Sequence, residues 1–377
     1  MEFKDLKRQY IRLKDDINNA VLSVLSEGKY IEGQQVAILE KQLAEFIGVK
    51  HCITCADGTD ALSLAFMTWE IGPGDAVFVP DFTFFSSGET IAHAGATPIF
   101  VDVELDTFNI SVESLKEIIQ ETLRIGTFKP RAIMAIDLFG LPANYPAIKT
   151  ICEKYDLLLL EDGAQGFGGC INNKKACGFG DISTTSFFPA KPLGCYGDGG
   201  AVFTDNDDYE GLIRSFKAHG KGTHKYDSIR VGMNSRLDTI QASILLVKLK
   251  SFIEFELEAI NSIADIFSNE LKDYVIIPTF PSGFYSSWAS FTIRLENKAI
   301  RDGLKNYLDE KGIPTMVYYP IPLHKQKALE GNPFAYKEYY PNSDILSETV
   351  LSLPLYSDLT DTEIYYITDS VKDFFNF

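Results

Sequence analysis

The stretch SFFPAKPLGCYGDGG, residues Ser186 to Gly200, says most about the fold and the chemistry of this chain. It places Lys191 between a β-prone run, STTSFF (183–188), and a loop that holds four glycines. A lysine in this position lies at a strand end, where flexible glycine backbone lets a bulky group approach. Its amine forms a Schiff base when burial or a nearby cation lowers its pKa. A surface lysine beside a turn gives the same pattern, so the run alone leaves both interpretations open.

A carboxylate upstream of Lys191 favours the chemical interpretation. The leucine run 157–160 is followed by Glu161 and Asp162, and an unbroken apolar run bounded by turn residues predicts a buried parallel strand. Asp162 then stands at the carboxyl end of that strand, where open α/β sheets bind their ligands. A carboxylate there holds a protonated pyridine nitrogen while a lysine holds the aldehyde carbon of the same ring, which is the protein's part in pyridoxal phosphate chemistry. A helix-capping role for Asp162 is the alternative.

Length and charge narrow the class of protein. A chain of 377 residues is long enough for two domains, or for one large domain with a smaller appendage. The formal net charge of −17 argues against a nucleic-acid partner, so an anionic ligand has to be met by a local cluster of donors. No apolar run is long enough to span a bilayer, and the charged segment MEFKDLKRQY lacks the apolar core of a signal peptide. We therefore expect a cytoplasmic enzyme with no membrane partner.

The cysteines predict no metal site. Cys52 and Cys55 form a CxxC pair, but no second pair follows at zinc-ribbon spacing. Their segment, HCITCADG, has the pattern of a strand that enters a turn. Buried, reduced thiols are the expected state of such residues in the cytosol.

The order of the expected elements predicts an α/β fold. Two amphipathic helices surround a turn at 27–35, and β-like runs at 51–56, 76–80, 98–102, 132–137, 157–162, 183–188 and 201–205 alternate with helical patterns. This alternation indicates a mostly parallel central sheet flanked by helices. A long helical pattern from Asp238 to about Asp273 then links a large domain, 1–250, to a smaller C-terminal α+β domain, 251–377. The smaller domain should carry strands near 275–278, 288–295 and 315–319 and a helix after 362.

Three residues are candidates for binding the phosphate of the cofactor. Gly58 and Thr59 open a helix, so their N–H groups can bind a phosphate with help from the helix dipole, and Ser186 can add its hydroxyl. Helix capping explains each of them alone. The planar ring also needs an apolar face to stack on. The segment DFTFFSS (81–87) offers Phe82, Phe84 and Phe85, and spacing cannot choose among them.

Seven motifs, taken in chain order, resemble those of the DegT-type sugar-nucleotide aminotransferases. They are CADGTDAL (55–62), VPDFTFFSS (79–87), LFGLPANY (138–145), LLEDGAQGFG (159–168), FGDISTTSFFPAKPLGCYGDGGAVFTD (179–205), VGMNSRLDTIQASIL (231–245) and YYPIPLHKQ (318–326). The resemblance covers nearly the whole chain. It implies a fold-type-I transferase dependent on pyridoxal 5'-phosphate.

The resemblance also implies roles for individual residues. Lys191 resembles the Schiff-base lysine, Asp162 the pyridinium partner and Gln165 a neighbour of the ring hydroxyl. Gly58, Thr59 and Ser186 match phosphate ligands, and Phe84 matches the stacking aromatic. Asn234 is similar to a residue that reaches the cofactor phosphate of the other subunit, which implies a homodimer with shared active sites. Arg236 and His324 match positions that line the sugar-nucleotide site.

The implied reaction is transamination from L-glutamate to a nucleotide-linked keto-sugar, for cell-surface glycans such as lipopolysaccharide. The segments KPLGCYGDGG and RVGMNSRLDTIQASILL most resemble the branch that aminates C3 of 3-keto sugars. A UDP-linked 2-acetamido sugar is the expected substrate. A dTDP-linked 6-deoxyhexose or a 4-keto sugar is the alternative, and the base and the C6 group stay open.

Three rival functions fit the residues less well. A sugar 3-dehydratase resembles this family but has histidine at the position of Lys191, and a nicotinamide-dependent oxidoreductase needs a GxGxxG after its first strand. A non-catalytic sensor has no need for the complete set of lysine, aspartate, glutamine and serine. The chain departs from the family pattern at Gly163, where alanine is usual, at Asp57, and at 124–131, which resembles a short insertion.

Overall fold

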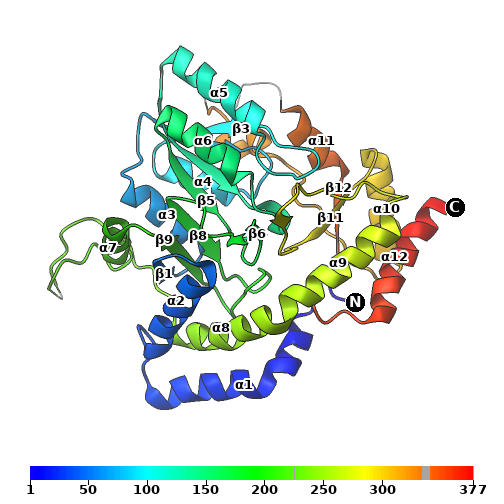
Figure 1. Cartoon of the computed structure of the whole chain (residues 1–377), viewed down its shortest axis with the longest axis horizontal. Coiled ribbons are helices and arrows are strands. Elements are labelled where there is room, and N and C mark those ends of the chain that lie inside the picture. The colour runs from blue at the N-terminus through cyan, green and yellow to red at the C-terminus, as the bar shows by residue number, and fades with distance from the viewer. Residues whose placement is uncertain (225, 333–339, 377) are drawn as a thin grey trace.

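The central sheet of the computed structural model has seven strands in the order β1-β9-β8-β5-β4-β2-β3 (Figure 1). The model describes residues 1–224, 226–332 and 340–376. The strands are β1 (His51–Cys55), β2 (Asp75–Pro80), β3 (Thr97–Val101), β4 (Lys129–Ile136), β5 (Leu158–Asp162), β8 (Ile182–Ser186) and β9 (Gly200–Thr204). β5 pairs in parallel with both of its neighbours, whereas β9 runs antiparallel to β8 and to β1. The predicted mostly parallel α/β sheet is confirmed.

Helices cover both faces of this sheet. On β2, Val77 and Val79 belong to the core under α3 (Gly58–Thr68) and α4 (Ser86–His93), with α7 (Asp207–Phe216) beside them. Ala76 and Phe78 face the opposite core, under α5 (Val112–Ile125) and α6 (Tyr145–Tyr155). Because alternate side chains of a strand point to opposite faces, a strand covered on both sides is apolar throughout. This explains why strands such as β2 and β9 are apolar along most of their length.

Two helices at the start of the chain and one long helical stretch frame the sheet. The predicted pair is α1 (Leu6–Glu27) and α2 (Gln34–Ile47). The predicted helix from Asp238 is α8 (Thr239–Ser251), a π-helical turn η2 (Phe252–Glu256) and α9 (Leu257–Leu271), which follow one another without a break. In Figure 1 this stretch crosses the molecule diagonally, with α1 packed along α8. No helix among the described residues is long and apolar enough to cross a membrane.

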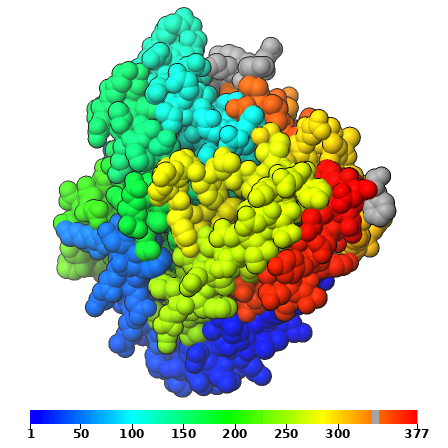
Figure 2. Space-filling model, turned by 45° about the vertical axis from the view of Figure 1, so that its right-hand side comes forward, coloured from blue at the N-terminus to red at the C-terminus, as the bar shows by residue number. Residues whose placement is uncertain are grey.

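The C-terminal part has an apolar core of its own. Its elements are β11 (Phe291–Arg294) and β12 (Val350–Leu353), which pair antiparallel, with α10 (Lys298–Glu310), α11 (Pro341–Thr349) and α12 (Asp361–Asn376). In Figure 2, α12 lies beside α9 across the surface. The division of the chain at residue 250 stays a prediction; that position is one residue before the end of α8.

Two strands predicted for the C-terminal part are wrong. Segments 275–278 and 315–319 make single bridges only, Ile276 with Arg294 and Met316 with Ser352. Prolines at 278 and 320 end both segments, and a proline cannot donate to a β-ladder. The remaining elements are short: strands β6 (Cys170–Ile171), β7 (Lys174–Lys175) and β10 (Phe284–Tyr285), and 3-10 turns η1 (Leu138–Gly140), η3 (Leu323–Lys325) and η4 (Lys327–Leu329).

Candidate active site

The start of α3 packs against the end of β8. A Cβ atom added to Gly58 would lie 2.7 Å from the Cβ of Ser186, and one added to Gly200 would lie 2.3 Å from the carbonyl oxygen of Asp57. Only glycine allows the backbone to approach this closely. The contact brings Gly58, Thr59 and Ser186, the three predicted phosphate residues, to one edge of the sheet.

The first turn of α3 presents free donors at this edge. The Asp57 side chain caps the helix by accepting from the N–H of Asp60 at 2.8 Å. Within the described part of the chain, the N–H groups of Gly58 and Thr59 donate no hydrogen bond. Such groups at a helix N-terminus bind anions, because the helix dipole adds to their partial charge. The arrangement therefore suits a phosphate group.

The loop after β8 holds Lys191 in a tight turn. Its N–H donates to the carbonyl of Phe188 at 2.9 Å. Gly194 approaches the carbonyls of Phe188 and Pro189 so closely that an added Cβ would lie 2.6 and 2.5 Å from their oxygens. Burial lowers the pKa of the Lys191 amine, while the nearby charge of Asp162 acts in the opposite direction. The predicted lysine and carboxylate thus lie close enough to interact.

Asp162 ends β5 as a buried carboxylate. One of its oxygens accepts from the N–H of Ala164 at 3.0 Å, and the described residues donate no other hydrogen bond to this carboxylate. Burial raises its pKa, and the Ala164 N–H and the charge of Lys191 lower it. A cationic N–H placed here would stabilise the charged form.

The side chain of Gln165 forms hydrogen bonds with two other segments of the chain. Its side-chain oxygen accepts from the N–H of Phe139 at 2.9 Å, and its nitrogen donates to the hydroxyl of Tyr319 at 3.2 Å. The ring of Tyr319 lies 6.1 Å from that of Phe84. Phe84 is 54 % exposed, whereas Phe82 is fully buried, so of these two Phe84 is the ring free to stack on a ligand. Sequence reasoning missed Tyr319, which lies inside the motif YYPIPLHKQ but differs in no local feature from Tyr318.

The contacts of Asn234 and Arg236 within this chain do not indicate what these residues bind. Asn234 is exposed and forms a single bridge with Ala218, while its neighbour Ser235 accepts from the N–H of Ala56 at 3.0 Å. The segment that carries Asn234 therefore contacts the loop before α3 of its own chain. The half-buried Arg236 forms no hydrogen bond or ion pair within the described ranges. Its predicted role, like that of Asn234, stays a prediction.

His324 is held inside the protein. Its Nδ1 lies 2.7 Å from a carboxylate oxygen of the fully buried Asp81, and its ring packs 4.9 Å from that of Tyr340. The side chain is only 11 % exposed. Asp81 thus orients the imidazole and fixes the start of η3, and a contact of His324 with substrate stays a prediction.

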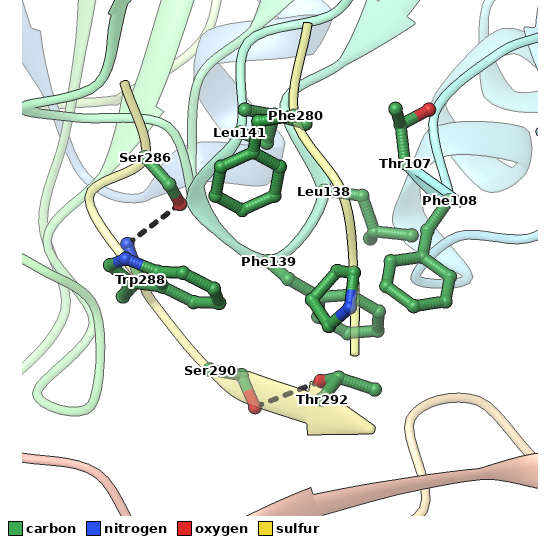
Figure 3. Close-up of a pocket in the computed structure, with 11 residues that line it drawn as sticks. Thr107, Phe108, Leu138, Phe139, Leu141, Phe280, Ser286, Trp288, Ser290 and Thr292 are labelled. Carbon is green, nitrogen blue, oxygen red and sulfur yellow. Dashed lines mark hydrogen bonds between the residues drawn. The ribbon is translucent and has the colours of Figure 1, made fainter. Parts of the chain in front are cut away.

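A small cavity lies where the loop after β4 meets the segment before β11 (Figure 3). The rings of Phe108, Phe139 and Trp288 surround it. Its volume is about 10 Å³, room for roughly one water molecule. This cavity is too small for a substrate.

The residues at the carboxyl edge fit pyridoxal phosphate. Free helix N–H groups and the Ser186 hydroxyl suit the phosphate, and the buried Asp162 suits the ring nitrogen. Lys191 supplies an amine for the aldehyde, and Phe84 offers a ring face. Fold and donor set together define a fold-type-I transferase that uses pyridoxal phosphate.

Comparison with known proteins agrees with this class. Residues 12–372 match the family described as "DegT/DnrJ/EryC1/StrS aminotransferase family", and the chain belongs to this family. It is 41 % identical to a UDP-2-acetamido-2-deoxy-3-oxo-D-glucuronate aminotransferase from Pseudomonas aeruginosa, over 97 % of this chain and 98 % of the relative. It is 36 % identical to a UDP-N-acetyl-3-dehydro-alpha-D-glucosamine 3-aminotransferase from Acidithiobacillus ferrooxidans, over 98 % and 96 % of the two chains. A dTDP-3-amino-3,6-dideoxy-alpha-D-galactopyranose transaminase from Aneurinibacillus thermoaerophilus is 34 % identical, over 98 % of both chains.

Solved structures agree as well. A DegT/DnrJ/EryC1/StrS aminotransferase from Brucella abortus has a TM-score of 0.96 and 46 % identity, with 99 % of both chains covered. NtdA from Bacillus subtilis, with bound cofactor PMP, has a TM-score of 0.88 and 28 % identity over 97 % of this chain and 82 % of that one. This protein is an aminotransferase whose cofactor is pyridoxal phosphate.

Proposed function

We propose that this enzyme transfers the amino group of L-glutamate to C3 of a UDP-linked 3-keto 2-acetamido sugar. The observation that carries the proposal is that Lys191 and Asp162 lie close enough to interact, at the same edge of the sheet as the free donors of α3. The substrate is inferred from the two relatives whose names describe UDP-linked 3-keto sugars, at 41 % and 36 % identity. The dTDP-linked alternative is represented by a relative at 34 % identity. Such a product suits the synthesis of cell-surface glycans, including lipopolysaccharide, in the cytoplasm.

Each residue at the edge of the sheet then has a chemical task. Bound pyridoxal phosphate supplies an electron-accepting ring that stabilises negative charge on the substrate carbon. Lys191 binds the aldehyde and, once freed, carries a proton to and from the substrate carbon, a task for which a lowered pKa is suited. Asp162 keeps the proton on the ring nitrogen. Gly58, Thr59 and Ser186 bind the phosphate.

The remaining residues orient the ring and the substrate. Phe84 covers one face of the cofactor ring, and Gln165 donates to or accepts from its hydroxyl. Arg236 and His324 line the sugar-nucleotide site. The Asp81–His324 pair supports this role for His324, because a second group that holds the imidazole fixes its orientation.

The active unit in this proposal is a homodimer in which Asn234 serves the partner's site. Support comes from apolar side chains that are exposed on a single chain, among them Ile11 and Leu22 on α1, Phe188 beside Lys191, and Val231 near Asn234. Exposed apolar side chains of this kind are typical of protein–protein interfaces.

A panel of nucleotide sugars tests the reaction. Purified enzyme with L-glutamate should aminate a UDP-linked 3-keto 2-acetamido sugar faster than a dTDP-linked 3-keto-6-deoxyhexose or a 4-keto sugar, as followed by mass spectrometry of the amino sugar. A preference for the dTDP-linked substrate would favour the alternative, and amination of none of the keto-sugars would contradict both.

Complementation tests the shared site. A Lys191→Ala chain refolded together with an Asn234→Ala chain should form heterodimers with one undamaged site. If half of the dimers are heterodimers, about a quarter of all sites are intact. Activity at limiting cofactor should then exceed the weighted sum of the parents. No excess, although heterodimers form, would show that Asn234 serves its own chain.

A further inference from the structure

A lysine from the start of the chain reaches the loop that carries Lys191. The Nζ atom of Lys4 donates to the carbonyl oxygens of Ala190, at 2.7 Å, and Lys191, at 3.1 Å. These carbonyls lie on the two sides of the Lys191 Cα. Among the described residues, no other donor bonds to either oxygen. The contact spans 186 residues of sequence.

The loop cannot supply these hydrogen bonds itself. Pro189 and Pro192 flank the pair and carry no N–H. The nearby N–H groups of Lys191 and Cys195 donate to the carbonyls of Phe188 and Phe187 instead. Lys4 therefore supplies two hydrogen bonds that the backbone of this loop does not make itself.

Lys4 is itself held in place by the start of α1. Asp5 caps the helix, and Arg8 donates two hydrogen bonds, at 2.7 and 2.6 Å, to Glu363 of α12. One turn later Arg12 forms an ion pair of 2.7 Å with Asp358. These contacts tie α1 to the C-terminal part. In Figure 2 the start of the chain (blue) lies directly below α12 (red). The Lys4 side chain therefore extends from a fixed backbone.

The surroundings of Lys4 lower the pKa of its amine. Burial, then the charges of Lys248 and Lys191, lower the pKa of the Lys4 amine to about 7, while Glu256 acts in the opposite direction. Lys248 is buried as well, with its Nζ 5.0 Å from the centre of the Tyr196 ring. Because the interaction between two charges is reciprocal, a protonated Lys4 disfavours a second charge on Lys191.

We propose that Lys4 is a positioning residue that clamps the backbone around Lys191 and thereby sets the orientation of the Lys191 amine. This inference rests on the role proposed above for Lys191. Misplacement of a reacting group by about 1 Å is enough to lower a rate roughly a hundredfold. A clamp on the backbone of the reacting residue is therefore expected to affect turnover more than substrate binding.

Lys4→Met tests the clamp, because methionine keeps the apolar stem and removes the donors. Lys14→Met, on an exposed position of α1, is the matched control. The reaction to follow is the half-reaction of the pyridoxal phosphate holoenzyme with L-glutamate, which needs no sugar. We expect the maximal single-turnover rate to be about 10- to 100-fold lower in Lys4→Met, and the glutamate concentration that gives half of the maximal rate to stay within about threefold of the wild type.

Two further readouts separate positioning from a general loss of stability. The pH titration of the visible absorbance of the bound cofactor should shift in Lys4→Met but not in Lys14→Met. Lys4→Arg, which keeps several donors, should restore most of the rate. If Lys4→Met does not fold, Lys4→Gln takes its place with the same expected result.

Other outcomes would overturn the proposal. The clamp is wrong if the rate and the absorbance titration of the Lys4 variant match the wild type, or if arginine does not rescue the rate. Failure of the wild type to show visible absorbance with the cofactor would instead contradict the role of Lys191. Failure with every keto-sugar would leave the clamp result intact, since the half-reaction does not involve the sugar.

Discussion

Glu161 and Asp162 are consecutive residues at the end of β5, and their side chains point to opposite faces of the sheet. The Glu161 carboxylate accepts from four groups of the protein: the N–H groups of Cys177 (2.6 Å), Phe179 (2.6 Å) and Gly180 (3.2 Å) and the hydroxyl of Ser183 (2.7 Å). Asp162, also buried, accepts from the N–H of Ala164 only, among the described residues.

The difference distinguishes a carboxylate that stabilises the fold from one that is available to bind a ligand. The region around Glu161 satisfies its carboxylate completely, so it holds β5, β8 and the turn before β8 together. The region around Asp162 leaves a buried acceptor available and places Lys191 nearby. The same functional group thus supports the fold on one face and chemistry on the other. The number of donors that the protein supplies decides which.

The largest expected effect is at Lys191. Lys191→Ala should abolish transamination and the visible absorbance of bound cofactor, because the described site offers no second amine at this position. The size of the protein in gel filtration should stay that of the wild type. Visible absorbance that persists in the variant would contradict the assignment.

Asp162→Asn should lower turnover by roughly two or more decades. An amide cannot hold the proton of the ring nitrogen as a carboxylate does. The variant should still bind cofactor and show its visible absorbance, so single-turnover rates with L-glutamate are the measurement. Near-native rates would mean that Asp162 only caps the turn that follows it.

Glu161→Gln should produce the reverse pattern. The amide turns a donor toward N–H groups that now lack an acceptor, so the free energy of unfolding should fall by about 2–4 kcal/mol. Turnover per folded molecule should change little. Urea denaturation and active-site titration measure the two quantities. A turnover loss as large as that of Asp162→Asn would remove the distinction between the two faces.

Gly163→Ala probes how closely the two regions pack. A Cβ atom at this position would lie 2.4 Å from the Sγ of Cys177, and such overpacking costs about 1–3 kcal/mol. Removing the sulfur in a Gly163→Ala/Cys177→Ala double variant should recover part of that loss. Thermal denaturation of the single and double variants tests this compensation, which additive effects would refute.

The smallest effect concerns the buried Asp137, whose Oδ2 has no hydrogen-bond partner in the described structure. Burial and the charge of Glu161 raise its pKa well above the ordinary value of 3.8. The folded protein therefore keeps a proton that the unfolded chain releases above that value, so this group lowers stability as pH rises toward its folded pKa. Asp137→Asn should show a weaker fall in stability as the pH rises above 3.8. Parallel pH profiles in urea denaturation would contradict this.

Much of the fold could be predicted because its signals are local. Most strands of the large sheet are apolar or β-prone runs bounded by turn residues, and most predicted helices are amphipathic or begin at a cap. The failures at 275–278 and 315–319 have a common cause. Four or five apolar residues suit a strand, but a strand also needs a partner, and these segments meet one only at Ile276 and Met316.

The candidate site likewise contains residues that the sequence predicts and residues that it does not. Lys191 and Asp162 were identified because each follows a strand whose pattern is clear in the sequence. Tyr319 and Lys4 were missed. Tyr319 contacts Gln165 from 154 residues away, and Lys4 contacts Ala190 from 186 residues away. No local pattern encodes such a contact.

The amino-acid sequence by itself determined the alternation of strands and helices, the edge of the sheet at which ligands bind, and the residue types available for chemistry there. These depend on periodicity and on residue type, which are properties of neighbouring residues. Only the tertiary structure decided that Phe84 rather than Phe82 is exposed, that Glu161 is satisfied and Asp162 is not, and that Lys4 meets the Lys191 loop. Burial and hydrogen-bond satisfaction depend on which distant segments pack together, and that is settled only when the whole chain has folded.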